Sequence, residues 1–523
     1  LVETDIPKDP LSDEVRQAQK LLSFAEALHA LHTPVDVAQA EAGRARLAFD
    51  ELLTYQLALQ SIKRTSQASG APTIPFDQTF AKKFVQHLPY PLTGDQKRAA
   101  WTVLQDMEKP TPMRRLLQGD VGSGKTVVAA FLAAHVQRAG SSAAFLAPTD
   151  ILARQHAETL RMFFSTWHIP LVLVTRTDKR AFFDGTIEEL SAAETEERIQ
   201  QGNVVLVGTH ALLEAKRIPS DLALAIVDEQ HRFGVAQREV LANPSRPDGL
   251  IPHLLSMTAT PIPRSLALTM YGDLDISLIR EKPKGRLPIA TRVCQGLERE
   301  DGYAAMRAAV AKGERVFVVC PLIDPSDVLG VKSVTEEIKR LGTGPLQGLS
   351  IGLVHGRLKS SEKDAVMQAF VKGDVQVLIA TSVIEVGIDV PQATVIAIEA
   401  AERFGLAQLH QLRGRVGRSS LRSQCFLFTD IQGSALDRLR LLEKHQDGLD
   451  LAEEDLKLRG AGNLVGLDQS GGQTFKAARL TDLELIHAAQ KVASTWLDED
   501  PTLERHDVWQ KRVKQVQETR HGE

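Results

Sequence analysis

Hydrophobic residues recur at two different spacings along the chain, and the helical spacing fills residues 1–85. The stretches "DEVRQAQKLLSFAEALHALH" and "AEAGRARLAFDELLTYQLALQSIKR" carry apolar residues three and four positions apart, among charged ones. Glycine and proline in "ASGAPTIP" (68–75) interrupt this pattern. We therefore expect a helical region at residues 1–85.

From residue 86 onward, short continuous apolar runs alternate with amphipathic stretches. Such runs between helices are typical of parallel strands in a sheet that is covered on both faces. The segment "EKPKGRLPIA" (281–290) has the composition of a linker and divides the runs into two series. The first series is "AAFLAP" (143–148), "NVVLVGT" (203–209), "LALAIVDE" (222–229) and "LLSMTAT" (254–260). The second is "RVFVVCP" (315–321), "SIGLVHG" (350–356), "VQVLIATS" (375–382), "TVIAIEA" (394–400) and "QCFLFTD" (424–430).

This pattern predicts an α/β protein with two parallel-sheet domains in tandem, at residues 86–280 and 281–430. After residue 430 the strand-like runs stop. The stretch "SALDRLRLLEKHQDGLDLAEEDLKLRG" has the spacing of two helices, and a glycine-rich loop follows it. We therefore expect residues 431–523 to form a C-terminal helical region.

Composition supports a folded protein of several domains. The 523 residues are 43% hydrophobic and 24% charged, and a chain of this length holds roughly three or four domains. No run of eighteen apolar residues occurs, so we expect no membrane span, and the first residues do not read as a signal peptide. Three cysteines lie far apart and lack metal-ligand spacing, which favours reduced, buried thiols in a cytosolic protein. The net charge of −4 means that any contact with DNA must come from local basic patches.

The stretch "GDVGSGKT" fits the phosphate-binding pattern G-x-x-x-x-G-K-[ST] in full. An apolar stretch, "RRLLQ", precedes it and a helical one follows, which is the context that this loop requires. Glycines let backbone amides face phosphate oxygens, and the helix N terminus adds positive partial charge. A chance glycine-rich loop is the weak alternative. We expect ATP and Mg²⁺ here, with Lys125 at the β- and γ-phosphates and Thr126 on the metal. The candidate nucleotide-binding residues are Gly119, Asp120, Val121, Gly122, Ser123, Gly124, Lys125 and Thr126.

Two adjacent carboxylates, Asp228 and Glu229, end a buried apolar run. Carboxylates are costly in such a place unless something uses them. We expect Asp228 to hold Mg²⁺ and Glu229 to polarise the attacking water. A capped strand end would give the same pattern, and only the phosphate-binding loop upstream makes the catalytic interpretation specific.

The stretch "QLHQLRGRVGR" (408–418) holds three arginines within six residues. An arginine from a second domain can stabilise the charge of a transferring γ-phosphate. We therefore expect Arg415 and Arg418 to act as catalytic arginines, and we count Gln411 of the same stretch with them. For Arg413, a structural role and a catalytic role remain equally open.

These motifs stand in the order found in superfamily-two helicases, and the chain resembles the RecG family of bacterial branch-migration helicases. The resemblance rests on "DVGSGKT", "APTDILARQH", "VGTHALL", "DEQHRFG", "MTATPIPR", "LVHGRL", "IATSVIEVGIDVP" and "QLHQLRGRVGR". The segment "DLKLRGAGNLVGLDQSGG" (455–472) resembles a translocation motif that RecG shares with Mfd. The likeness covers about residues 86–475. It implies two RecA-like domains, with a helical linker region before them and a helical-hairpin translocation module after them.

The resemblance also implies roles for individual residues in the two sheet domains. Gln96 of "LTGDQ" matches the adenine-reading position, and Tyr90 could pack on the base or belong to the core. Thr258 and Thr260 match the motif that couples hydrolysis to domain movement. Gly387 and Asp389 of "EVGID" match contacts of the second domain to nucleotide and DNA.

In the C-terminal region, Arg438, Arg459 and Gln469 match positions through which the helical hairpin drives duplex DNA. An ordinary surface arginine is the alternative for Arg438. The family carries an N-terminal wedge, an OB-fold that splits the fork, and this sequence begins after that position. A truncated chain and a natural absence of the wedge both remain open, and fork specificity depends on which holds.

The implied function is that of a DNA-dependent ATPase that translocates on duplex DNA and remodels stalled forks and Holliday junctions. The implied partners are branched and duplex DNA and single-stranded DNA-binding protein. A monomer in the bacterial cytoplasm, at the nucleoid and not at a membrane, is expected. One alternative is a translocase like Mfd that couples transcription to repair. The other is a nucleotide-gated DNA-binding module without turnover.

Overall fold

The computed structural model describes residues 8–67, 69–234, 237, 240–241, 246–261, 263, 274–283, 285–321, 339–381, 390–459, 475–479 and 482–521. The chain divides into two compact units. The first contains Leu1–Gly70, Ile262–Asp275 and Leu456–Glu523, and the second contains Ala71–Pro261 and Ile276–Asp455.

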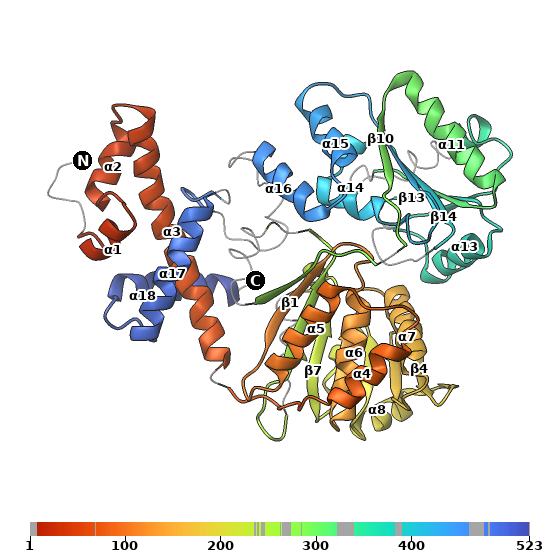
Figure 1. Cartoon of the computed structure of the whole chain (residues 1–523), viewed down its shortest axis with the longest axis horizontal. Coiled ribbons are helices and arrows are strands. Elements are labelled where there is room, and N and C mark those ends of the chain that lie inside the picture. Colours follow the sequence, from red (N-terminus) through yellow and green to blue (C-terminus); the bar gives the residue numbers. More distant parts are fainter. Residues whose placement is uncertain are drawn as a thin grey trace. The chain divides into compact units, whose positions relative to one another are not determined.

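The first unit is helical, as expected for the start of the chain. Its helices are α1 (Asp13–Ala18), α2 (Phe24–His32), α3 (Val37–Gln67), α17 (Leu483–Glu499) and α18 (Asp507–His521). The long helix α3 packs against α2, α17 and α18, so both ends of the chain contribute to one core (Figure 1). Phe49 and Leu53 of α3 are buried there with Trp496 of α17 and Trp509 of α18.

The first sheet of the second unit has nine strands in the order β5-β4-β3-β6-β2-β7-β8-β1-β9. The pairs from β3 to β1 are parallel, whereas β4 and β5 add an antiparallel edge. The strands are β1 (Arg114–Gly119), β2 (Ser142–Leu146), β3 (Leu171–Val174), β4 (Lys179–Phe183), β5 (Thr186–Glu189), β6 (Val205–Gly208), β7 (Leu222–Val227), β8 (His253–Thr258) and β9 (Asp275–Ile279). The four apolar runs expected here are therefore strands β2, β6, β7 and β8.

Helices cover this sheet, and α6 packs against β1, β2 and β7. The helices are α4 (Gln78–His87), α5 (Gly94–Met107), α6 (Lys125–Arg138), α7 (Asp150–Phe164) and α8 (Ala192–Gln200), with short 3₁₀ turns η2 (His210–Leu213), η3 (Ala215–Arg217) and η4 (Gln230–Arg232). The core under them also takes Ile74, Phe80 and Phe84. Residues 71–85 thus pack with this sheet, although the expected domain began at residue 86.

The second sheet has six strands in the order β10-β15-β14-β11-β13-β12, and each pair is parallel. The strands are β10 (Ala290–Cys294), β11 (Arg315–Val319), β12 (Ile351–Val354), β13 (Val377–Ala380), β14 (Ala393–Ile398) and β15 (Gln424–Phe428). The helices and 3₁₀ turns are η5 (Gly296–Glu298), α11 (Arg299–Ala311), α13 (Ser360–Lys372), η7 (Ala401–Arg403), α14 (Leu406–Arg413), α15 (Ser434–Lys444) and α16 (Gly448–Arg459). The expected α/β class with two parallel-sheet domains is confirmed.

The three cysteines, Cys294, Cys320 and Cys425, are free and buried, as the sequence predicts. In the part of the chain that the structure describes, no helix has the length and apolar character needed to cross a membrane.

Candidate nucleotide site

The phosphate-binding loop joins strand β1 to helix α6 at the carboxyl edge of the first sheet. Gly122 and Gly124 have φ values of +72° and +86°, which residues other than glycine rarely adopt. Gly124 is the N-cap of α6 and has no side chain that could accept from the first amides of the helix. These amides can therefore donate hydrogen bonds to an anion. The loop therefore has the backbone form that the motif predicts.

Lys125 is buried at the start of α6, and its Nζ donates to the carbonyl oxygens of Gly119 (2.7 Å) and Asp120 (3.1 Å). Burial lowers the pKa of Lys125, while the carboxylates of Glu229 and Asp228 oppose that shift. The ammonium group of Lys125 thus feels the negative charge of Asp228 and Glu229, which directly follow strand β7.

Asp228 is held by a neighbour that sequence reasoning did not single out. Its Oδ2 lies 2.9 Å from Nε2 of His156 on α7, and its Oδ1 accepts from the amide of Glu229 at 3.0 Å. Burial opposes ionisation, but the hydrogen bond and charge of His156 outweigh it and lower the pKa of Asp228. Burial and the charge of Asp228 raise the pKa of Glu229. Two adjacent carboxyls thus have opposite tendencies to ionise.

Gln96 links helix α5 to the phosphate-binding loop. Its Oε1 accepts from the amide of Thr93 at 2.9 Å in a capping box, and its Nε2 donates to the carbonyl of Ser123 at 2.7 Å. The amide keeps one lone pair and one proton beyond these bonds, which is what reading a base requires. Tyr90 is 43% exposed, and its ring meets the ring of Phe163 edge-on at 6.5 Å.

Residues of the second sheet domain reach the first at this edge. Nε2 of Gln411 on α14 donates to Oγ1 of Thr260 at 2.8 Å, and the amide of Thr260 donates to Oγ1 of Thr258 at 3.1 Å. Burial and Asp228 raise the pKa of Glu229, and the charge of Arg415 opposes that rise; burial lowers the pKa of Lys125, and the charge of Arg418 adds to that fall. The structure thus brings these candidates together with the phosphate-binding loop.

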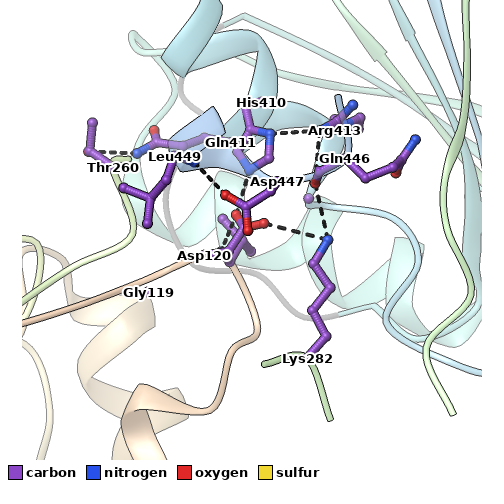
Figure 2. A network of polar contacts seen from close by, with 12 residues as sticks. Gly119, Asp120, Thr260, Lys282, His410, Gln411, Arg413, Gln446, Asp447 and Leu449 are labelled. Carbon is purple, nitrogen blue, oxygen red and sulfur yellow. Dashed lines mark hydrogen bonds and ion pairs between the residues drawn. The ribbon is translucent and has the colours of Figure 1, made fainter. Parts of the chain in front are cut away.

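A polar network joins the loop to helix α14 (Figure 2). Nε2 of His410 lies 2.5 Å from Oδ1 of Asp120, and Nδ1 of His410 receives a hydrogen bond from Arg413 at 2.7 Å. Burial would raise the pKa of Asp120, yet the contact with His410 and the charge of Lys282 lower it to about 2. Gly414 follows directly, and a Cβ there would lie only 2.8 Å from Cβ of Val121.

Arg413 is structural in this arrangement. It is buried, and its guanidinium donates to the carbonyls of Leu442, His445 and Gln446 at 2.8, 2.9 and 3.3 Å. These carbonyls end helix α15 and begin the turn to α16, where a cation satisfies otherwise unpaired acceptors. The role that the sequence left open for Arg413 is therefore the support of this turn.

Oxygen donors suited to Mg²⁺ stand beside the loop. The hydroxyl of Thr126 and the carboxylate of Asp228 are hard ligands of the kind that Mg²⁺ takes in small number, together with phosphates and water. No group of three or more metal-ligating side chains occurs within the described ranges. The Thr126 hydroxyl and the Asp228 carboxylate fit an ion that takes its remaining ligands from phosphates and water.

Several candidate residues lie beyond what the structure describes. Gly387, Asp389 and Gln469 fall outside the described residues, and the side chain of Arg459 at the end of α16 does so too. Arg438 on α15 is described, and its Nε donates to Oδ1 of Asp455 on α16 at 2.9 Å.

Sequence reasoning missed two residues of this site, His156 and His410, and two linker residues that contact the loop from outside the site, Lys282 and Arg286. His156 and His410 stood inside quoted motifs, yet a histidine on a helix carries no signal of its partner. Lys282 and Arg286 belong to the expected linker, where charged residues usually indicate only a solvated segment.

Comparison with known families assigns most of the second unit and the C-terminal region. A model described as DEAD/DEAH box helicase matches residues 93–269, and one described as Helicase conserved C-terminal domain matches residues 302–420. A third, ATP-dependent DNA helicase RecG, domain 3, C-terminal, matches residues 445–521.

Curated relatives cover nearly the whole chain. The ATP-dependent DNA helicase RecG of Bacillus subtilis is 39% identical over 498 residues, which are 94% of this chain and 71% of that protein. The chain belongs to the RecG family. The RecG protein of Synechocystis sp. is 43% identical over 522 residues, which are 98% of this chain and 61% of the relative. This RecG family chain thus spans about 61% of the length of the first relatives it matches.

Solved structures agree with this assignment. A RecG structure bound to a three-way DNA junction matches with a TM-score of 0.74 and 38% identity, over 92% of this chain and 62% of the other. The DUF1998 helicase MrfA bound to DNA is 16% identical, with a TM-score of 0.52, over 72% of this chain and 55% of the other. This more distant likeness concerns the fold alone.

Proposed function

We propose that this RecG family chain is an ATP-hydrolysing motor that translocates on duplex DNA and remodels branched DNA, namely stalled forks and Holliday junctions. The observation that carries the proposal is that helix α14 of the second sheet domain bonds to the first at and beside the phosphate-binding loop, through His410 to Asp120 (2.5 Å) and Gln411 to Thr260 (2.8 Å). A site built from two domains can change shape with each cycle of hydrolysis. The RecG relative solved on a three-way DNA junction supports branched DNA as the substrate.

Each group at the site has a chemical role in this proposal. The loop amides and Lys125 bind the β- and γ-phosphates, and Thr126 and Asp228 would hold Mg²⁺, which would supply positive charge beside the phosphates. Glu229 orients the attacking water and takes its proton. His156 fixes the orientation of the Asp228 carboxylate, as partners of ligating side chains do.

The second sheet domain completes the site. Arg415 and Arg418 stabilise the charge that develops on the γ-phosphoryl group, a contribution of about 10³–10⁵ in rate for such arginines. Gln411 couples hydrolysis to movement of the domains through its hydrogen bond to Thr260. The amide of Thr260 in turn bonds to the hydroxyl of Thr258. Gly387 and Asp389 are proposed to contact nucleotide and DNA, and Gln96 and Tyr90 to bind the base.

Movement along DNA is assigned to the C-terminal region. Arg438 pairs with Asp455 and thereby ties α15 to α16, while Arg459 and Gln469 are proposed to act on duplex DNA. We further propose a monomer that works in the cytoplasm at the nucleoid, with single-stranded DNA-binding protein as a partner.

One experiment tests the function. ATP turnover is measured without DNA, with linear duplex and with a forked duplex, and fork reversal is followed in parallel. We expect turnover to rise with DNA, most with the fork, and to vanish in Lys125→Ala. ATP binding without turnover under all three conditions would leave the nucleotide-gated binding module as the better hypothesis. Displacement of a stalled RNA polymerase, without fork reversal, would favour a role like that of Mfd.

A further inference from the structure

The linker between the two sheets, residues 280–289, contacts the nucleotide loop through side chains as well as joining the domains. It starts at the N terminus of α5, where the two segments exchange hydrogen bonds. The carboxylate of Asp95 accepts from the amides of Arg280 (2.9 Å) and Glu281 (2.8 Å), and Glu281 accepts from the amides of Gly94 (2.7 Å) and Asp95 (3.3 Å). The start of the linker is thus fixed one residue away from Gln96.

Two linker cations reach the phosphate-binding loop. Nη1 of Arg286 donates to the carbonyl of Val121 at 3.1 Å, and its guanidinium covers Gly122 so closely that a Cβ there would be 2.1 Å from Nη1. Nζ of Lys282 lies 3.6 Å from Oδ2 of Asp120. The loop that would hold the phosphates is therefore contacted by the linker at three successive residues.

Lys282 has a second partner outside the nucleotide loop. Its Nζ donates to the carbonyl of Gln446 at 3.2 Å, in the turn between α15 and α16 (Figure 2). Nε2 of Gln446 in turn donates to the carbonyl of Ile289 at the end of the linker, at 3.1 Å. One ammonium group thus bridges the nucleotide loop and the helical hairpin.

A cavity beside Lys282 leaves space for its side chain to move. A cavity of about 320 Å³ opens between the loop, the linker and the turn, lined by Asp120, Lys282, Arg286, His410, Arg413 and Asp447 among others. Phosphate groups bring several negative charges close to Asp120, and a cation beside them feels a different field before and after hydrolysis. Its hydrogen bond to Gln446 is charge-assisted, so the position of the ammonium group matters to the turn.

We propose that Lys282 and Arg286 are positioning residues that couple the state of the nucleotide loop to the α15–α16 turn, and so to the proposed DNA-moving helices. This inference rests on the proposed function. It adds a linker path that runs beside Arg413 of helix α14, which donates to the same Gln446 carbonyl, and that does not include Arg438 within the hairpin. Neither residue is needed to bind Mg²⁺ or to orient water, so their loss affects movement more than hydrolysis.

The test compares movement with hydrolysis in the same 523-residue chain. Movement is measured as displacement of a third strand from a DNA triplex, which reports translocation on duplex, and ATP turnover is measured in the same reaction. For Lys282→Gln and Arg286→Gln, we expect the displacement per ATP to fall about fivefold or more, the low end of typical coupling effects. The kcat and KM for ATP should stay within about twofold of the wild-type values, since contacts made in the transition state are intact.

Two variants separate coupling from a loss of structure. Lys282→Arg keeps the positive charge and should restore at least about half of the displacement per ATP. Lys312→Gln changes an exposed lysine at the end of α11 and should leave the ratio unchanged. An unchanged ratio in Lys282→Gln and Arg286→Gln would overturn the inference, as would an equal fall in movement and hydrolysis. A wild-type chain without DNA-stimulated turnover would instead overturn the proposed function.

Discussion

The imidazole of His410 donates from Nε2 to Oδ1 of Asp120 over 2.5 Å and so joins helix α14 directly to the phosphate-binding loop. Its tautomer follows from the neighbours. Arg413 can only donate, so Nδ1 of His410 must accept, and the proton resides on Nε2. Oδ1 of Asp120 also accepts from the amide of Val121 at 2.7 Å, which makes the shape of the loop depend on a residue of the second sheet domain.

His410→Ala should therefore slow ATP hydrolysis, because it removes the imidazole donor from the half-buried Asp120 carboxylate, which keeps only its contacts with the Val121 amide and Lys282 among those described. We expect kcat to fall about tenfold, equivalent to roughly 1.4 kcal/mol, which is close to what a hydrogen bond to a charged group contributes. Asp120→Asn should lower kcat as well. In the double variant the two effects should fall short of additive by about 1 kcal/mol, as expected for residues in contact. Strictly additive effects would show that the contact does not matter for turnover.

Lys125→Ala should abolish ATP hydrolysis and leave the fold intact. A positioned cation in a water-poor site contributes on the order of 3 kcal/mol, so kcat should drop about a hundredfold or more. The measurement is steady-state turnover with forked DNA, with circular dichroism as the check of folding. Lys97→Ala, at an exposed lysine of α5, is the matched control and should behave like the wild type. Near-normal turnover in Lys125→Ala would exclude this loop as the site of hydrolysis.

Arg418→Ala should slow hydrolysis far more than it weakens ATP binding. The residue belongs to the second sheet domain, whose helix α14 contacts the phosphate-binding loop through His410, so we expect it to act on the γ-phosphoryl group as charge develops. We expect kcat to fall about 10³-fold, or roughly 4 kcal/mol, with a smaller change in nucleotide Kd.

Salt distinguishes this role of Arg418 from a DNA contact. Contacts to DNA phosphate weaken as salt rises, so a defect of that kind would be rescued at low salt. The kcat and the nucleotide Kd are therefore measured at two salt concentrations. Arg422→Ala, which changes an exposed neighbouring arginine, is the control. A defect confined to DNA affinity and rescued at low salt would make this stretch a DNA-binding patch.

Arg459→Ala and Gln469→Ala should impair movement on DNA more than ATP hydrolysis. Both positions lie outside the two sheets that form the nucleotide site, so the chemistry of hydrolysis should continue without them. Fork reversal and ATP turnover are measured in one reaction. We expect the amount of fork reversal per ATP hydrolysed to fall in both variants. Full fork-reversal activity in both variants would exclude these residues from translocation.

Asp50 in the helical unit should make stability depend on pH. Burial raises its pKa to about 6, against the attraction of Arg46 and Arg512. The folded chain therefore binds this proton more tightly than the unfolded chain does. The contribution to stability is complete below the unfolded pKa of 3.8 and is lost as the pH rises through 6.

Between pH 5 and 8 this loss amounts to roughly 1 kcal/mol. Asp50→Asn removes the titration, and its unfolding free energy, followed by tryptophan fluorescence, should change with pH by that much less than the wild type. Glu484→Gln alters an exposed carboxylate on α17 and serves as control. Identical pH dependence in Asp50→Asn and the wild type would contradict the raised pKa.

Local pattern alone predicted two parallel sheets and the nucleotide loop of this chain, although strands β3, β9 and β10 were not among the predicted runs. Continuous apolar runs such as "LALAIVDE" must be buried on both faces, and the glycines of "GDVGSGKT" permit backbone angles that other residues avoid, so neighbours along the sequence suffice to predict both. Strands β4 and β5 escaped that reasoning, because an exposed antiparallel edge such as Thr186–Glu189 lacks a continuous apolar run. The start of the first sheet domain escaped it too, because α4 has the same helical spacing as α3, and only packing shows which core it joins.

Only the tertiary structure decided which side chains meet at the nucleotide site. His156 reaches Asp228 across 72 positions, and His410 reaches Asp120 across 290. Arg413 could be catalytic or structural by sequence, and the carbonyls at the end of α15 make it structural. The physical reason is that a hydrogen bond depends on distance and direction in space. Sequence periodicity records which residues are buried, whereas the partner of a polar group is set by the folding of distant segments onto one another.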